Sequence, residues 1–154
     1  MTKYESLLVE AEKHKIKIKE IDFGDCEECG YYSNNKVLIN RNLLDKQKHV
    51  ILAEELGHYN KTVGNITNQN KIENVKQEKK ARNWGYEKLV GIIDIVNAYN
   101  SGARNRCELA EYLEVTEEFL EEAIQHYREK YGAYFEIDNY IVMFEPHFGI
   151  IKKF

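Results

Sequence analysis

The amino-acid sequence predicts a fold of the α+β class. Apolar residues at helical spacing fill the N-terminal segment and most of the stretch from residue 43 to residue 131. Short β-type runs lie between residues 16 and 40, and apolar alternation returns after residue 132. The order is therefore a helix, a group of strands, a group of helices and a terminal hairpin. Segregation of this kind is typical of α+β proteins.

The N-terminal part is predicted to hold one helix and three strands. Apolar residues at helical spacing predict a helix from Tyr4 to Lys15. Isoleucines that nearly alternate with charged residues predict a half-buried strand from Ile16 to Ile21. After a loop over residues 24–30, the run YYSNNKVLIN predicts a hairpin, because Ser33-Asn34-Asn35 is turn chemistry between two β-type segments.

Helices are predicted to fill the middle of the chain, over Leu43–Asn60, Ile72–Leu89, Ile92–Tyr99, Glu108–Leu113 and Thr116–Tyr131. Thr116 is a good N-cap for the last helix, and Gly132 ends it. The tail alternates apolar residues around Asp138-Asn139, which predicts a C-terminal β-hairpin.

Composition and charge limit the class of protein. The chain has 154 residues, with 43% hydrophobic and 31% charged residues, so it can bury a core without disulfides or a structural metal. A net charge of -4 disfavours a nucleic-acid partner, because proteins that bind nucleic acid usually show a basic face. No apolar run reaches the ~18 residues of a membrane span, and the charged N-terminus lacks a signal-peptide core. We therefore expect a cytoplasmic protein that does not act at a membrane.

The three cysteines do not suggest a disulfide framework. Cys26 and Cys29 form a lone C-x-x-C, which supplies half of the ligands that a structural zinc site needs, so we interpret them as incidental loop residues. Cys107 lies beside Leu109 and Ala110 and is expected to be buried. No G-x-S-x-G occurs, so a serine hydrolase has little support.

The stretch LAEELGHYN carries the chemistry. Glu54 and His58 are four residues apart, about 40° from each other around a helix, so both side chains leave from one face. Glu55 follows the first of them, where H-E-x-x-H zinc peptidases have the general base. The motif is thus H-E-x-x-H with glutamate in place of its first histidine. Spacing alone also leaves open an ordinary solvated helix face.

A third metal ligand has to come from another element, because a catalytic zinc keeps three protein ligands. His49 is nine residues before His58, about half a turn away around the helix, so it is rejected. Glu78, in QEKKARNWGYEKL, is the best candidate, since helices joined by a short loop run antiparallel. Ala81 is small enough to allow close approach, and Trp84 is expected to pack below the site.

Four segments of the chain resemble the ImmA/IrrE family of metallopeptidases, which are common in phages and mobile elements of Gram-positive bacteria. They are LLVEAEKHKIKIKEI, GYYSNNKVLIN, HVILAEELGHYNKT and QEKKARNWGYEKL. The tail from LAEYLEVTEEFL onward resembles the C-terminal part of phage-borne members. The resemblance implies a zincin-like peptidase domain over residues 1–90 and a helical, helix-turn-helix-like region with a β-hairpin over residues 91–154.

The resemblance also implies roles for particular residues. Glu54, His58 and Glu78 correspond to metal ligands, and Glu55 corresponds to the catalytic base. Glu54 departs from the family's H-E-x-x-H pattern. Zinc is the expected metal, but two carboxylates are harder ligands than imidazole and favour manganese or iron more than a histidine-rich site does. The additional negative charge also makes a coordinated water less acidic, so low activity is expected.

The implied function is a metal-dependent endopeptidase that acts on the repressor of a phage or mobile element, and so serves as an anti-repressor. The alternative is a pseudo-peptidase that binds a repressor or another protein without cutting it. The strand Lys36–Asn40 is expected to hold an extended peptide along its edge. Tyr59, His126 and His147 are open candidates for stabilising the oxyanion, although packing or surface roles are commoner for each.

The C-terminal helices also invite a DNA-binding interpretation. The second helix carries Glu117, Glu118, Glu121 and Glu122 in its first turns, where recognition helices contact bases. Four carboxylates there would be repelled by phosphate, so nucleic-acid binding is not expected. Packing on the peptidase domain, or binding of a protein partner, fits this segment better.

Overall fold

A computed structural model of the chain describes residues 1–24, 30–33, 35–61 and 72–153. The chain forms two compact units, Met1–Gly85 and Tyr86–Phe154. The boundary lies within one helix, and each unit has its own buried core. Cys26, Cys29 and Asn34, to which the sequence analysis gave roles, lie outside the described residues.

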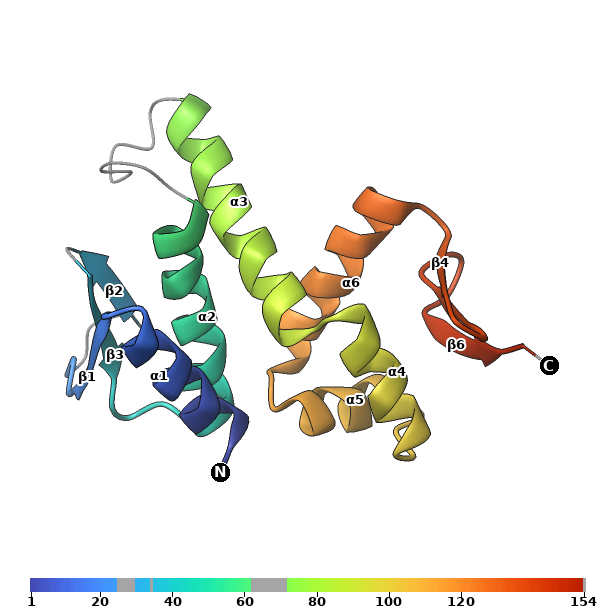
Figure 1. The fold of residues 1–154 in the computed structure, drawn as a ribbon, viewed down its shortest axis with the longest axis horizontal. Coiled ribbons are helices and arrows are strands. Elements are labelled where there is room, and N and C mark those ends of the chain that lie inside the picture. The colour runs from blue at the N-terminus through green and yellow to red at the C-terminus, as the bar shows by residue number, and fades with distance from the viewer. Residues whose placement is uncertain (25–29, 34, 62–71, 154) are drawn as a thin grey trace. The chain divides into compact units, whose positions relative to one another are not determined.

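The first unit combines a small sheet with helices. Its elements are α1 (Lys3–Lys13), β1 (Lys17–Ile21), β2 (Gly30–Ser33), β3 (Lys36–Asn40), α2 (Asp45–Lys61) and most of α3 (Ile72–Leu89). The strand order is β1-β3-β2, with β1 parallel and β2 antiparallel to β3. Helices α1 and α2 pack on the sheet and on each other (Figure 1). Tyr4, Leu7 and Ala11 bury one side of α1, as their spacing predicts.

The second unit begins with the last turn of α3. Its further elements are α4 (Ile92–Asn100), α5 (Arg106–Leu113), α6 (Glu117–Tyr131), β4 (Tyr134–Ile137), β5 (Tyr140–Met143) and β6 (Gly149–Lys152). The strands form an antiparallel sheet in the order β4-β5-β6. Phe119, Ile124 and Tyr127 of α6 are buried, and the Tyr127 hydroxyl donates to the Val90 carbonyl at 2.6 Å.

The predicted α+β class is confirmed, with helices and strands close to their predicted positions. The C-terminal hairpin is confirmed as β4–β5, and β6 extends it to three strands. Two expectations are wrong. Strand β3, Lys36–Asn40, is the central strand and has a neighbour on each side, so it has no open edge for a peptide. Cys107 is exposed, because it lies outside the row formed by Leu109, Ala110 and Leu113 on α5.

Candidate active site

The candidate site depends on an unusually close contact between α2 and α3. Gly57 lies so near the backbone of Ala81 that a Cβ at position 57 would be 2.8 Å from the Ala81 carbonyl carbon. One turn away, Gly85 lies against Ala53 at ordinary van der Waals distance. The earlier residue of α2, Ala53, meets the later residue of α3, Gly85, so the two helices run antiparallel (Figure 1). As expected, the small side chain of Ala81 lies where the two helices approach closely, and Gly57 lies opposite it.

This close contact brings His58 and Glu78 together. The Nε2 atom of His58 is 3.6 Å from a carboxylate oxygen of Glu78, and both side chains are only partly exposed. Two ligands of a tetrahedral zinc, each about 2.0–2.1 Å from the metal, lie about 3.3 Å apart. The His58–Glu78 separation is therefore near the distance at which both atoms can bind one ion.

Glu55 occupies an environment that suits a general base. Three effects together raise the pKa of its carboxyl from 4.5 to about 7. Burial is the largest, and the negative charges of Glu54 and Glu78 add to it. A carboxylate with a pKa near neutrality accepts protons much better than an ordinary surface glutamate does. The same shift indicates that Glu54 and Glu78 each lie close enough to Glu55 to repel its carboxylate.

His58 is held toward its neutral form, which is the form that binds metals. Burial lowers the pKa of the imidazole, the positive charge of Arg82 lowers it too, and the Glu78 carboxylate opposes both. Arg82 was not foreseen from the sequence. Its signal was available, because Arg82 is four residues after Glu78 and so shares the face of α3 that meets α2.

The donor set fits a divalent metal chemically, with one imidazole and nearby carboxylates. Zinc, manganese and iron all accept such ligands. Within residues 1–24, 30–33, 35–61 and 72–153, however, no three His, Cys, Asp or Glu side chains are arranged to hold a metal ion. His58 and Glu78 are brought together, whereas Glu54 is half-buried on the preceding turn of α2. Its place as the third ligand remains a prediction.

The other sequence candidates lie elsewhere. His49 is buried, 3% exposed, and Trp84 lines a small hollow with Tyr59 and His14. Tyr59 packs against the His14 ring, with 6.0 Å between ring centroids. In the second unit, His126 contacts Glu87 at 3.2 Å, and His147 is exposed in the segment after β5. The oxyanion stabiliser is therefore still unassigned.

A partly buried glutamate beside a histidine–glutamate pair that joins two antiparallel helices is the arrangement expected of a metallopeptidase. Comparison with family models agrees: the model of the IrrE N-terminal-like domain, which defines a peptidase family, matches residues 11–125. The match spans more than half of the chain, and the protein belongs to this ImmA/IrrE family of metallopeptidases. No curated protein and no solved structure matches the chain significantly.

Family membership carries a metallopeptidase-type function and a protein as substrate class. Members generally depend on a metal. Among the described residues, no helix combines the length and apolar character needed to cross a bilayer.

Proposed function

We propose that the protein is a metal-dependent endopeptidase in which Glu54, His58 and Glu78 hold the metal and Glu55 is the general base. The observation that carries this proposal is the 3.6 Å separation between His58 Nε2 and the Glu78 carboxylate, across two helices. Glu54 completes the set by its one-turn spacing from His58. Zinc is the proposed metal, with manganese and iron as alternatives that the carboxylate-rich donor set allows.

The residues divide the chemistry between them. A bound metal would supply Lewis acidity toward the attacking water and the scissile carbonyl. Glu55, with its pKa near 7, takes the proton of the attacking water and delivers it to the leaving amine. Burial, with a smaller contribution from Arg82, lowers the pKa of His58 and favours the neutral imidazole, which keeps a lone pair for the metal. The close contact at Gly57 keeps α3, and therefore Glu78, near α2.

The proposed substrate is a helix-turn-helix repressor of a phage or mobile element, which makes the enzyme an anti-repressor. An extended substrate needs an outer strand, and β3 is unsuitable because it is central. Strand β2 pairs with β3 on one side and lies at the end of the described sheet, on the part that packs against α2. We infer that a peptide adds to the outer edge of β2, beside the helix that carries Glu55.

The test is cleavage of a purified helix-turn-helix repressor of the proposed class, with zinc or manganese added, followed by mass spectrometry of the products. E55Q keeps the shape of the side chain and removes the base, so the cleavage rate should fall about 10³-fold. E87Q, a glutamate in the second unit with its own histidine partner, is the matched control and should cleave at the wild-type rate.

The same assay separates the alternative, a pseudo-peptidase that binds a repressor without cutting it. The extra negative charge of Glu54 is the feature that favours this alternative. Tight binding of the repressor by wild type and E55Q alike, with no cleavage by either, would establish the binding protein and remove the enzyme.

A further inference from the structure

The second unit contains a pocket that the proposed peptidase function does not use. It has a volume of about 280 Å³ and is formed by α4, α5, the segment between them, and the start of β6 (elements labelled in Figure 1). All of its lining residues lie between Ile95 and Ile150, within the second unit. Its volume is close to the lower end of the ~300–1,000 Å³ that is usual for small-molecule sites.

The floor of the pocket is apolar. Ile95 and Leu109 are buried, with 0% and 4% exposure, and Phe148 and Ile150 are half-buried beside them. A ligand that covers the half-buried Phe148 and Ile150 gains the hydrophobic free energy of removing their remaining surface from water, and Ile95 and Leu109 back this floor. The floor therefore selects a compact apolar group, and the pocket volume excludes a large one.

The rim carries positive charge at a fixed position. Arg104 donates from its Nη1 atom to the carbonyl oxygens of Tyr99, at 2.6 Å, and Ala103, at 3.1 Å. Its guanidinium also lies over the Tyr99 ring, 4.2 Å from the centroid. These contacts use part of the five-donor fork and hold it in place, so the cost of ordering the side chain is already met before a ligand binds.

Arg104 and Arg106, both on the rim, differ in whether a carboxylate balances their charge. Arg106 shares its charge with Glu121, at 3.0 Å from the Nε atom, whereas no carboxylate in the described parts of the chain forms an ion pair with Arg104. Asn105 between them caps α5 through the Glu108 amide at 2.8 Å, which fixes the backbone of the segment. The rim thus presents one guanidinium that is anchored by carbonyls and a ring, with its net charge available to an anion.

We propose that this pocket binds a small organic anion, a carboxylate with a compact aromatic or branched apolar body. The apolar body lies on Ile95, Leu109, Phe148 and Ile150, and the carboxylate pairs with Arg104. A charge-assisted hydrogen bond to a preorganised arginine contributes more than a neutral one, so the anion should bind more tightly than a neutral analogue of the same shape.

The test uses the ¹⁵N-labelled full chain in a ¹H–¹⁵N NMR titration with 3-phenylpropionate, and in parallel with its neutral analogue 3-phenylpropanamide. We expect saturable shifts of the backbone amides of residues 103–106 and 148–150, and affinity for the acid about tenfold above that for the amide. R104Q should lower the affinity for the acid about tenfold and leave that for the amide unchanged. R104K, which keeps the charge without the planar fork, should lower it less.

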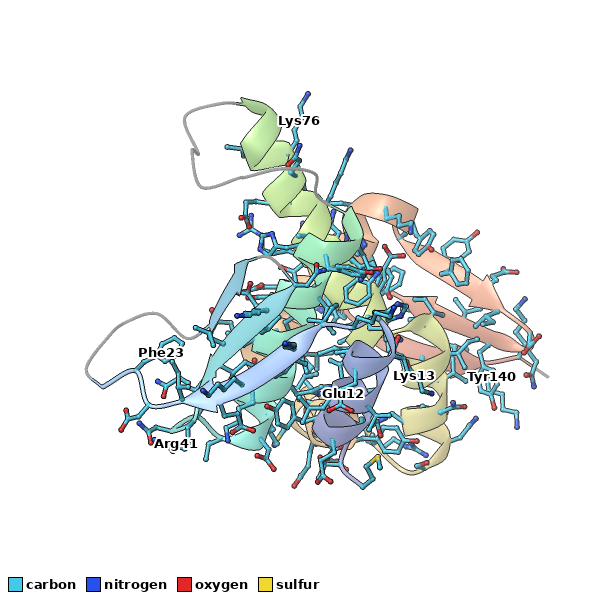
Figure 2. The ribbon with its side chains drawn as sticks, turned by 60° about the vertical axis from the view of Figure 1, so that its left-hand side comes forward. Glu12, Lys13, Phe23, Arg41, Lys76 and Tyr140 are labelled. Carbon is cyan, nitrogen blue, oxygen red and sulfur yellow. The ribbon has the colours of Figure 1, made fainter. Side chains whose placement is uncertain are left out.

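The control is R41Q, which removes an exposed arginine after β3 in the first unit (Figure 2) and should leave binding unchanged. The wild-type pair of probes keeps the test valid even if R104Q perturbs the segment around it. Equal affinity for acid and amide, shifts scattered over the surface, or no saturable shift with either probe would overturn the proposal. None of these readouts requires metal or peptidase activity, so they are independent of the proposed function.

Discussion

Helix α3 carries two glutamates that each face a histidine of another helix, and the two pairs are built differently. Glu78, in the first unit, lies 3.6 Å from His58. Glu87, in the second unit, lies 3.2 Å from His126 and also accepts from the Lys130 ammonium at 2.6 Å. The residue types are the same, so the difference in their surroundings decides what each pair can do.

In the second pair, a lysine balances the charge of the carboxylate. Burial acts to raise the pKa of Glu87, but hydrogen bonds from Lys130 and His126 hold that pKa below its usual value. Glu78 instead lies near Glu55, and burial together with the charges of Glu54 and Glu78 raises the pKa of Glu55 to about 7. The first pair thus lies beside a further carboxylate, and a divalent cation would relieve the repulsion between them. In the second pair, the Lys130 ammonium already balances the charge of Glu87.

The largest expected difference between the His58–Glu78 and His126–Glu87 pairs is in zinc affinity. E78Q removes a proposed ligand and should lower zinc affinity on the order of 100-fold or more, because even indirect partners of a metal site are worth ~10–100-fold. E87Q should leave zinc affinity unchanged. Competition with a chromophoric chelator measures both variants. Equal affinities for wild type and E78Q would show that Glu78 is not a ligand.

The pH dependence of stability should distinguish Glu55 from Glu87, because their pKa values shift in opposite directions. The measurement uses protein kept free of metal by a chelator. Folded Glu55 keeps its proton up to pH about 7, whereas the unfolded chain releases it near pH 4.5. The folded state then holds the extra proton between these values, so this group makes stability fall as pH rises through that window. E55Q should therefore raise the free energy of unfolding at pH 8 by about 2–3 kcal/mol and have little effect near pH 4.5.

The matched variant E87Q should show the reverse. The lowered pKa of Glu87 contributes stability above its unfolded pKa, and that contribution is lost as pH falls. E87Q should thus destabilise the protein at pH 8 and have progressively less effect toward pH 3. Urea unfolding at several pH values measures both. Parallel stability curves for E55Q and wild type would mean that Glu55 titrates like an exposed carboxylate.

The sequence predicted more of the fold than of the contacts at the site. Helical spacing placed Glu54, Glu55 and His58 on one helix, and antiparallel packing brought Glu78 to His58 as expected. Both expectations rest on the spacing of residues within one helix and on the tendency of consecutive helices to run antiparallel. The four-residue spacing from Glu78 places Arg82 on the same face of α3, but spacing alone does not show that its charge acts on His58.

Other errors came from features that have no local signature. The central position of β3 depends on its parallel pairing with β1, and the strand order cannot be read from alternation within one strand. The exposure of Cys107 depends on the rotational phase of α5, and eight residues define that phase poorly. The third C-terminal strand, β6, is four residues long, too short for alternation to distinguish it from a loop.

The smallest expected effect tests whether the close contact between α2 and α3 holds Glu78 beside His58. G57A places a Cβ 2.8 Å from the Ala81 carbonyl carbon and closer still to its oxygen, so the helices must move apart. Overpacking of this kind costs ~1–3 kcal/mol, partly offset by the ~1 kcal/mol by which alanine favours a helix over glycine. We expect a net loss of up to about 2 kcal/mol in urea unfolding, with weaker zinc binding because Glu78 withdraws from His58.

The control for that substitution is G85A, one turn along the same crossing. Its Cβ would meet Ala53 at 3.5 Å, an ordinary contact, so the helix propensity of alanine should leave stability unchanged or raise it by up to about 1 kcal/mol. If G57A is as stable as G85A and binds zinc like wild type, the close approach at Gly57 does not set the distance between His58 and Glu78. In that case the loss expected for E78Q would have to arise from the glutamate alone, independent of how tightly α3 is held against α2.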